Sequence, residues 1–159
     1  MPTKDEQTRR EFFTSSSQVA AAAAAMALLH GCGGGGSSPT GSSPSFSTLP
    51  TINATIASST INLSVDASSP LATVGGAALV LTLSARVLVA RTAQDVFVAF
   101  TAMCTHEACT ITGFASPRFV CPCHGSTFDM TGRPTSGPAP RALQPYATSF
   151  TGNVLSIAL

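Results

Sequence analysis

Two short blocks in the C-terminal half of this chain constrain it more than any other feature. The first reads Cys-Thr-His-Glu-Ala-Cys (104–109) and the second reads Cys-Pro-Cys-His-Gly-Ser (121–126). Each block offers one thiolate and one imidazole at close spacing, together with a spare cysteine. Such pairs can bind a tetrahedral zinc ion or, when two loops meet, a binuclear iron–sulfur cluster. The sequence therefore predicts two loops that close around a metal centre.

The four predicted ligands follow a specific pattern, Cys104-x-His106 and then Cys121-x-x-His124. This pattern resembles the Rieske iron–sulfur family, and the likeness covers roughly residues 60–159. The resemblance implies a [2Fe–2S] cluster in which Cys104 and Cys121 bind the inner iron and His106 and His124 bind the outer one. A structural zinc site is the alternative, but it leaves the surrounding residues unexplained.

The same resemblance gives roles to residues around the ligands. Cys109 and Cys123 match the pair that bridges the two loops as a disulfide in the respiratory and photosynthetic branch; the alternative is two free thiols. Ser126 matches a serine whose hydroxyl donates to a bridging sulfide. A proline-rich loop that shields the cluster corresponds to Gly137, Pro138, Ala139 and Pro140.

One position departs from the high-potential members of that family. Phe128 stands where those members carry a tyrosine whose hydroxyl reaches a ligand sulfur, and it can also be read as an ordinary core aromatic. The single tyrosine of the chain, Tyr146, lies too far along to take that role obviously. With one of two donors missing, we expect a reduction potential below that of the highest members.

Charge counting explains why two histidines matter. Two ferric ions, two sulfides and two thiolates have formal charges that sum to zero when both imidazoles are neutral. A cluster with four thiolates would already be negative before it received an electron. Reduction of the histidine-bound cluster therefore occurs at a higher potential.

The N-terminus predicts export. Residues 8–13, Thr-Arg-Arg-Glu-Phe-Phe, resemble a twin-arginine signal, and the apolar run Val19–Leu29 follows. As a helix this run would span only ~17 Å, against a hydrocarbon core of ~30 Å, so a signal peptide is favoured over a membrane span. Leu-His-Gly-Cys, ending at Cys32, resembles a lipoprotein processing site, which would make Cys32 the lipidated first residue.

Three domains are expected from these features. Residues 1–31 would be the export signal, and residues 32–48 would be the lipidated cysteine and a flexible Gly/Ser/Pro tether. Residues 49–159 would form the cluster-binding domain. Its metal-binding blocks lie in a small inserted subdomain at about 102–141, which is richer in Cys, Gly and Pro than its flanks.

Short apolar runs separated by turn signals predict an all-β fold, in which a Rieske-type antiparallel β-sandwich carries the inserted subdomain. No long stretch has helical periodicity. The expected strands are Thr51–Ala57, Thr60–Val65, Ala77–Leu83, Arg86–Arg91, Val96–Thr101, Ala142–Phe150 and Val154–Leu159.

Composition excludes nucleic acid as a partner, because charged residues make up 9% of the chain and the net charge is +1. A terminal oxygenase would need further histidines for a mononuclear iron, and the sequence holds only His30 besides the two ligands. The remaining prediction is a one-electron carrier at the periplasmic face, anchored only by its lipid and without a substrate site of its own. It would serve redox protein donors and acceptors, alone or as the small subunit of a periplasmic oxidoreductase. The alternative is the Rieske subunit of a quinol-oxidising cytochrome bc complex.

Overall fold

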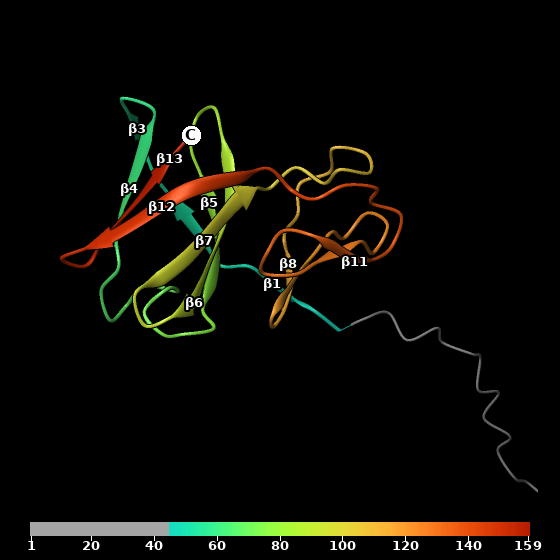
Figure 1. Ribbon diagram of the computed structural model, residues 1–159, viewed down its shortest axis with the longest axis horizontal. Coiled ribbons are helices and arrows are strands. Elements are labelled where there is room, and N and C mark those ends of the chain that lie inside the picture. The colour runs from blue at the N-terminus through green and yellow to red at the C-terminus, as the bar shows by residue number, and fades with distance from the viewer. Residues whose placement is uncertain (1–44) are drawn as a thin grey trace, which may run out of the picture. The chain divides into compact units, whose positions relative to one another are not determined.

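The computed structural model describes residues 45–159, and every regular element in that range is a β-strand (Figure 1). The predicted all-β class is confirmed. No helix in this range is long and apolar enough to cross a bilayer. The strands are β1 Ser47–Thr48, β2 Thr51–Asn53, β3 Ile56–Ala57, β4 Thr60–Ser64, β5 Ala77–Leu81, β6 Arg86–Ala93, β7 Val96–Thr101, β8 Gly113–Ala115, β9 Arg118–Val120, β10 Thr127–Phe128, β11 Pro134–Ser136, β12 Pro145–Thr151 and β13 Val154–Ala158.

The larger sheet has eight strands in the order β2-β5-β6-β7-β12-β13-β4-β3. All its pairs are antiparallel except β2 with β5. Strand β12 carries the sheet around a corner, because Pro145 and Tyr146 pair with β7 whereas residues 147–151 pair with β13. The two halves of the sheet therefore pack face to face, which confirms the predicted sandwich.

The middle strands of this sheet are buried on both faces. In β6, Val87 and Val89 pack into the core between the two halves of the sandwich, while Leu88 faces the opposite core. That second core also contains Phe100, Phe119 and the two cysteines predicted to bind iron, Cys104 and Cys121. Burial on both faces explains why β5 and β6 read as continuous apolar runs rather than alternating ones. It also means that the metal-binding loops rest on a rigid sheet.

The inserted subdomain is a second sheet, of five strands in the order β1-β8-β9-β10-β11 (Figure 1). Strands β8 to β11 lie between β7 and β12 in the chain and fall within the predicted range of 102–141. Ser47 and Thr48, which precede the predicted start of this domain at residue 49, pair with β8. Gly113 allows the segment that contains Phe46 to lie close to β8, because a Cβ on residue 113 would lie only 2.5 Å from the Phe46 ring.

One predicted strand is divided in two. Within the expected run 51–57, β2 pairs in parallel with β5, whereas β3 pairs with β4 in the other half of the sandwich. The chain therefore changes partner between Asn53 and Ile56. The apolar character of the whole run hid this change, because both halves of the run face a core.

The predicted export signal, with its paired arginines Arg9 and Arg10, lies outside the described residues. So do the predicted lipidation residue Cys32 and most of the predicted tether.

Candidate metal centre

The first loop, residues 104–109, follows β7 and closes on itself through its own backbone. The Cys104 carbonyl accepts a hydrogen bond from the Ala108 N–H at 2.9 Å, and the Cys104 N–H donates to the Cys109 carbonyl at 2.8 Å. Ala108 adopts a φ of 56°, in the left-handed region. This closure buries Cys104 at the base of the loop and leaves His106 nearer the surface.

The second loop, residues 121–126, repeats this closure. The Cys121 carbonyl accepts from the Gly125 N–H at 3.0 Å, and the Cys121 N–H donates to the Ser126 carbonyl at 2.8 Å. Gly125 adopts a φ of 71°, matching its counterpart in the first loop. Again a cysteine is buried at the base, and His124 lies toward solvent. The two loops thus present the same backbone frame from two places in the sequence.

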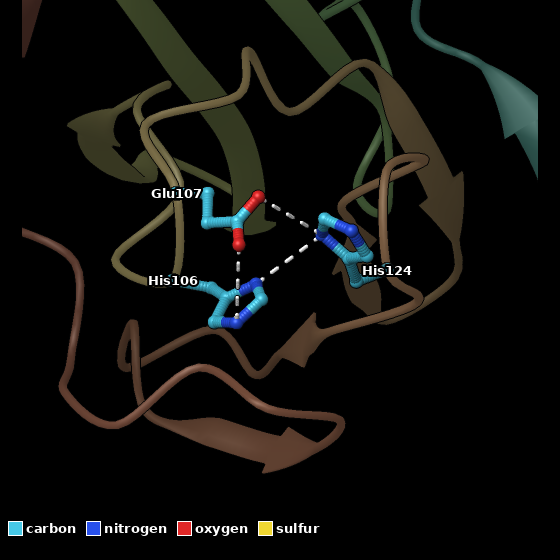
Figure 2. A group of neighbouring side chains, drawn as sticks. All are labelled: His106, Glu107 and His124. Atoms are coloured by element: carbon cyan, nitrogen blue, oxygen red, sulfur yellow. Dashed lines mark hydrogen bonds and ion pairs between the residues drawn. The ribbon is translucent and has the colours of Figure 1, made fainter.

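The two histidines converge on one point (Figure 2). Their Nδ1 atoms lie 3.2 Å apart, and their rings are nearly perpendicular with centroids 4.8 Å apart. Two nitrogens held tetrahedrally by one metal ion at ~2.1 Å would lie ~3.4 Å apart. The separation of His106 and His124 therefore fits two imidazoles that share one metal ion.

The two loops also carry two thiols that are not part of a disulfide. Cys104 and Cys121 are both free and buried. Burial raises the pKa of the Cys121 thiol, and the neighbouring Cys104 thiol raises it further. Two buried thiols this close would be stabilised as thiolates by a bound cation. Two buried thiols and two partly exposed imidazoles on the same pair of loops are a donor set that fits an iron–sulfur centre with two kinds of ligand.

A disulfide joins the two loops. Cys109 at the end of the first loop is bonded to Cys123 in the second, with a Cα–Cα distance of 6.6 Å. This confirms the predicted pairing and excludes two free thiols. The bond fixes the distance between the loops independently of any metal.

A third loop, residues 137–141, contacts both ligand loops. The Ala139 N–H donates to the Ser126 hydroxyl oxygen at 3.1 Å, and the Thr105 hydroxyl donates to the Arg141 carbonyl at 2.7 Å. Gly137 has a φ of 82°, and a Cβ there would lie only 2.5 Å from the Ser126 Cα. The third loop, which includes the segment 137–140 that the sequence predicts to shield the cluster, thus contacts both the first and the second loop.

Phe128 is fully buried in the core that contains both ligand cysteines. Tyr146, which the sequence placed too far from the site, lines the same hollow as Cys104 and His106. Nothing in the sequence predicts this position, since it results from the pairing of β12 with β7.

Glu107 lies at the rim of the site (Figure 2). Its carboxylate oxygens lie 3.9 Å from His106 Nε2 and 3.8 Å from His124 Nδ1, and its side chain is 61% exposed. The three residues therefore form a group that could hold an ion by themselves. We assign Glu107 to the rim, because iron–sulfur clusters use thiolates and imidazoles as ligands and the same two loops carry two free, buried cysteines.

Known proteins resemble this chain most strongly over a short stretch. Cytochrome b6-f complex iron-sulfur subunits of Nostoc and of Synechococcus elongatus are 49% identical over 43 residues and 51% identical over 51 residues. These matches cover 26% and 31% of this chain, and 24% and 28% of those proteins. The chain therefore matches only about a quarter of the length of these curated relatives.

Solved structures extend the likeness. The plasma membrane Rieske protein of Synechocystis PCC 6803 is 35% identical, with a TM-score of 0.48 over 53% of this chain and 87% of that one. Naphthalene 1,2-dioxygenase aligns with a TM-score of 0.50 at 18% identity, over 61% of this chain and 25% of that one. At that identity the second likeness concerns the fold alone.

Residues 63–147, more than half of the chain, match the model of the Rieske [2Fe-2S] domain. This range contains both ligand loops and the third loop, and the match implies a Rieske-type [2Fe–2S] cluster as cofactor. The sandwich, the inserted subdomain and the bridged loops agree with that match. The chain belongs to the Rieske [2Fe–2S] family.

Proposed function

We propose that this chain is an exported one-electron carrier, in which Cys104 and Cys121 hold the inner iron and His106 and His124 the outer one. The observation that carries the proposal is the convergence of the two Nδ1 atoms, on two loops that each also carry a free, buried cysteine. The match to the Rieske domain supports the same four residues, since all lie within its range.

The exposure of the two histidines suggests the route of the electron. The side chains of His106 and His124 are 28% and 46% exposed, whereas both cysteines are buried. When bound, the cluster supplies a one-electron redox couple. The imidazole edges are then the ligand atoms that a partner can approach most closely, and the carrier needs no substrate site of its own.

Two neighbours would tune the reduction potential. The Ser126 oxygen already accepts a hydrogen bond from Ala139, so its own hydrogen remains free to donate to a sulfur atom of the centre. Phe128 is buried beside the centre but has no hydroxyl to donate. We infer a potential below that of family members with both donors. Gly137, Pro138, Ala139 and Pro140 would shield the cluster from water.

A potentiometric titration of the full chain, followed by electron paramagnetic resonance at several pH values, tests this proposal. We expect a rhombic signal on reduction and a potential within ≈ −150 to +300 mV that falls as pH rises. Zinc in place of iron, with no signal, would refute electron transfer.

Export and anchoring rest on the sequence alone. The paired arginines Arg9 and Arg10, the short apolar run and Cys32 support a twin-arginine lipoprotein signal, followed by a tether at the periplasmic face. Arg9→Lys with Arg10→Lys should retain the protein in the cytoplasm, and Cys32→Ser should abolish labelling by a fatty acid while export continues. Fractionation measures both. Export of the double-lysine variant at the normal level would refute the twin-arginine route.

A second candidate is the iron–sulfur subunit of a quinol-oxidising complex. It is favoured by the identity of 49–51% to short stretches of cytochrome b6-f subunits. Purification of the tagged full chain from mild detergent separates the alternatives. Recovery with a b-type cytochrome supports the complex, recovery with a large molybdenum subunit supports a periplasmic oxidoreductase, and recovery alone supports a solitary carrier.

A further inference from the structure

A groove runs from the first loop to the turn between β5 and β6. Two adjoining hollows, of about 290 and 610 Å³, share the lining residues Thr101, Met103, Ala108 and Tyr146. One hollow extends to the turn at residues 82–85, and the other reaches His106. The turn before β6 and the first loop after β7 lie at the same end of the β6–β7 pair (Figure 1). There the Ala102 N–H donates a hydrogen bond to the Arg86 carbonyl.

Two large apolar side chains are uncovered along this groove. Leu83, at the tip of the turn, is fully exposed, and Met103 is 57% exposed. A single exposed apolar residue is ordinary, but two on one groove next to a redox centre suggest an interaction site. Tyr146 adds an aromatic side chain to the lining of both hollows. Methionine, tyrosine and arginine are residue types enriched in protein interfaces.

The turn that presents Leu83 is held rigidly. The Thr82 N–H and hydroxyl both donate to the Ala85 carbonyl, at 2.9 and 3.0 Å. The Thr82 oxygen accepts in return from the N–H groups of Ser84 and Ala85. An apolar tip fixed in this way loses little conformational entropy when it is covered by a partner.

The charges along the groove are mainly positive. Arg86 lines one hollow and Arg141 the other, and both are exposed. Within residues 45–159, neither has a carboxylate close enough for an ion pair. Glu107 is the one acidic residue in the two linings. Two unpaired guanidinium groups at the rim are suited to bind carboxylates on an approaching surface.

We propose that this groove is the docking surface for an acidic redox protein, whose carboxylates pair with Arg86 and Arg141 while an apolar patch covers Leu83 and Met103. The inference rests on the proposed electron-transfer function and specifies the partner for it. Docking here brings the partner to the exposed edge of His106 at the end of the groove. One electron then passes between the two proteins without any bond being made or broken.

The test uses the reduced full chain and two forms of one electron acceptor, basic mitochondrial cytochrome c and its succinylated, acidic derivative. Stopped-flow spectroscopy follows the single electron that enters the ferric haem. We expect the acidic form to react about tenfold faster at low salt, with a rate that falls as salt increases. A rate that is equal, or higher with the basic form, would overturn the proposal.

Matched variants locate the site on the groove. Arg86→Gln and Arg141→Gln should each slow reduction of the acidic acceptor about threefold, and together about tenfold. Leu83→Gln should slow it at every salt concentration. Arg118→Gln and Val74→Gln change an exposed arginine and an exposed valine that do not line the groove, and they should leave the rate unchanged.

The reduction potential and the paramagnetic signal of each variant distinguish the two hypotheses. If a groove variant has a normal reduction potential and a normal paramagnetic signal but reacts at the native rate, the docking proposal is wrong while the electron-transfer function stands. A second copy of the chain is the other possible occupant. Sedimentation that showed a dimer dissociated by Leu83→Gln would assign the groove to self-association and overturn the acidic partner.

Discussion

The first and second loops share one pattern of backbone hydrogen bonds, their common frame, but carry their histidines at different positions in it. In each, the opening cysteine accepts from the N–H four residues on and donates to the carbonyl five residues on. The histidine is the third residue of the first loop and the fourth of the second. The comparison shows that loop closure and ligand placement are separate properties: the frame positions the cysteines, and the tip positions the imidazoles.

The loops also differ at the residue that must adopt a positive φ. The second loop uses Gly125, which has no Cβ to strain, whereas the first uses Ala108. An alanine in the left-handed region costs about 1 kcal/mol. The first loop bears this strain while it is held by the disulfide at Cys109 and by the hydrogen bond from Thr105 to the third loop.

The largest effect should come from the cysteine that opens either loop. Cys104→Ser and Cys121→Ser each remove one of two buried thiolates, so both should abolish the cluster to the same extent. Iron content and the paramagnetic signal of the reduced protein measure the loss. A normal signal from either variant would break the equivalence of the two loops and contradict the ligand assignment.

Removing the Cys109–Cys123 disulfide, which joins the two loops, should have the second largest effect. The cysteines are 14 residues apart, and a closed loop of this size stabilises by about 3 kcal/mol through the entropy of the unfolded chain. Cys109→Ser, Cys123→Ser and the double variant should therefore lose similar free energies of unfolding in urea. If the double variant unfolds at the native midpoint, the third loop alone is enough to hold the two loops together.

Gly137→Ala tests how tightly the third loop holds the second. The new Cβ would be strained by the positive φ and would also clash with Ser126, so we expect a loss of about 2–3 kcal/mol. Gly152→Ala is the control, since it has a φ of 57° but no atom within 4 Å of the new Cβ. It should lose only about 1 kcal/mol. Equal losses in urea unfolding would show that the contact with Ser126 contributes nothing.

Exchanging the residues at the positive φ should have opposite effects in the two loops. Ala108→Gly should relieve strain and stabilise the first loop by up to about 1 kcal/mol, less the greater entropy of glycine in the unfolded chain. Gly125→Ala should destabilise the second loop by about 1 kcal/mol, because alanine is strained at this positive φ. The loss should be no larger, since the new Cβ would meet no other atom. Thermal unfolding measures both. A shift of the same sign in both variants would show that the loops are not equivalent in backbone strain.

The smallest effect concerns the hairpins that follow the loops. Asp129 closes the turn between β10 and β11, where hydrogen bonds from Thr131, first its hydroxyl and then its N–H, lower the pKa of the carboxyl. A lowered pKa stabilises the fold above the ordinary carboxyl pKa of ~4, and this contribution is lost as pH falls through the lowered value.

Asp129→Asn should therefore cost roughly half a kcal/mol at pH 7, since the side chain remains in contact with water. The difference from the native protein should shrink below about pH 4. Thr131→Ala should have the same sign. Urea unfolding at pH 7 and pH 3 measures the change, and a difference that grows in acid would contradict the assignment.

The sequence alone determined the chemistry of this protein. The spacing of Cys104, His106, Cys121 and His124 predicted a mixed sulfur and nitrogen donor set, and the family resemblance paired Cys109 with Cys123 correctly. The longer strands were also evident, because runs of five or more apolar and β-branched residues carry their own signal.

The tertiary structure decided what depends on residues distant in the sequence. Strands β8 to β11 have only two or three residues each, too short for a periodic pattern, and they form because neighbouring strands supply their hydrogen bonds. The common frame of the loops, the contacts of the third loop and the place of Tyr146 in the same hollow as His106 arise in the same way. A ligand pattern is local and can be read directly from the sequence. A groove, or a third loop that contacts two others, exists only once separate segments have packed together.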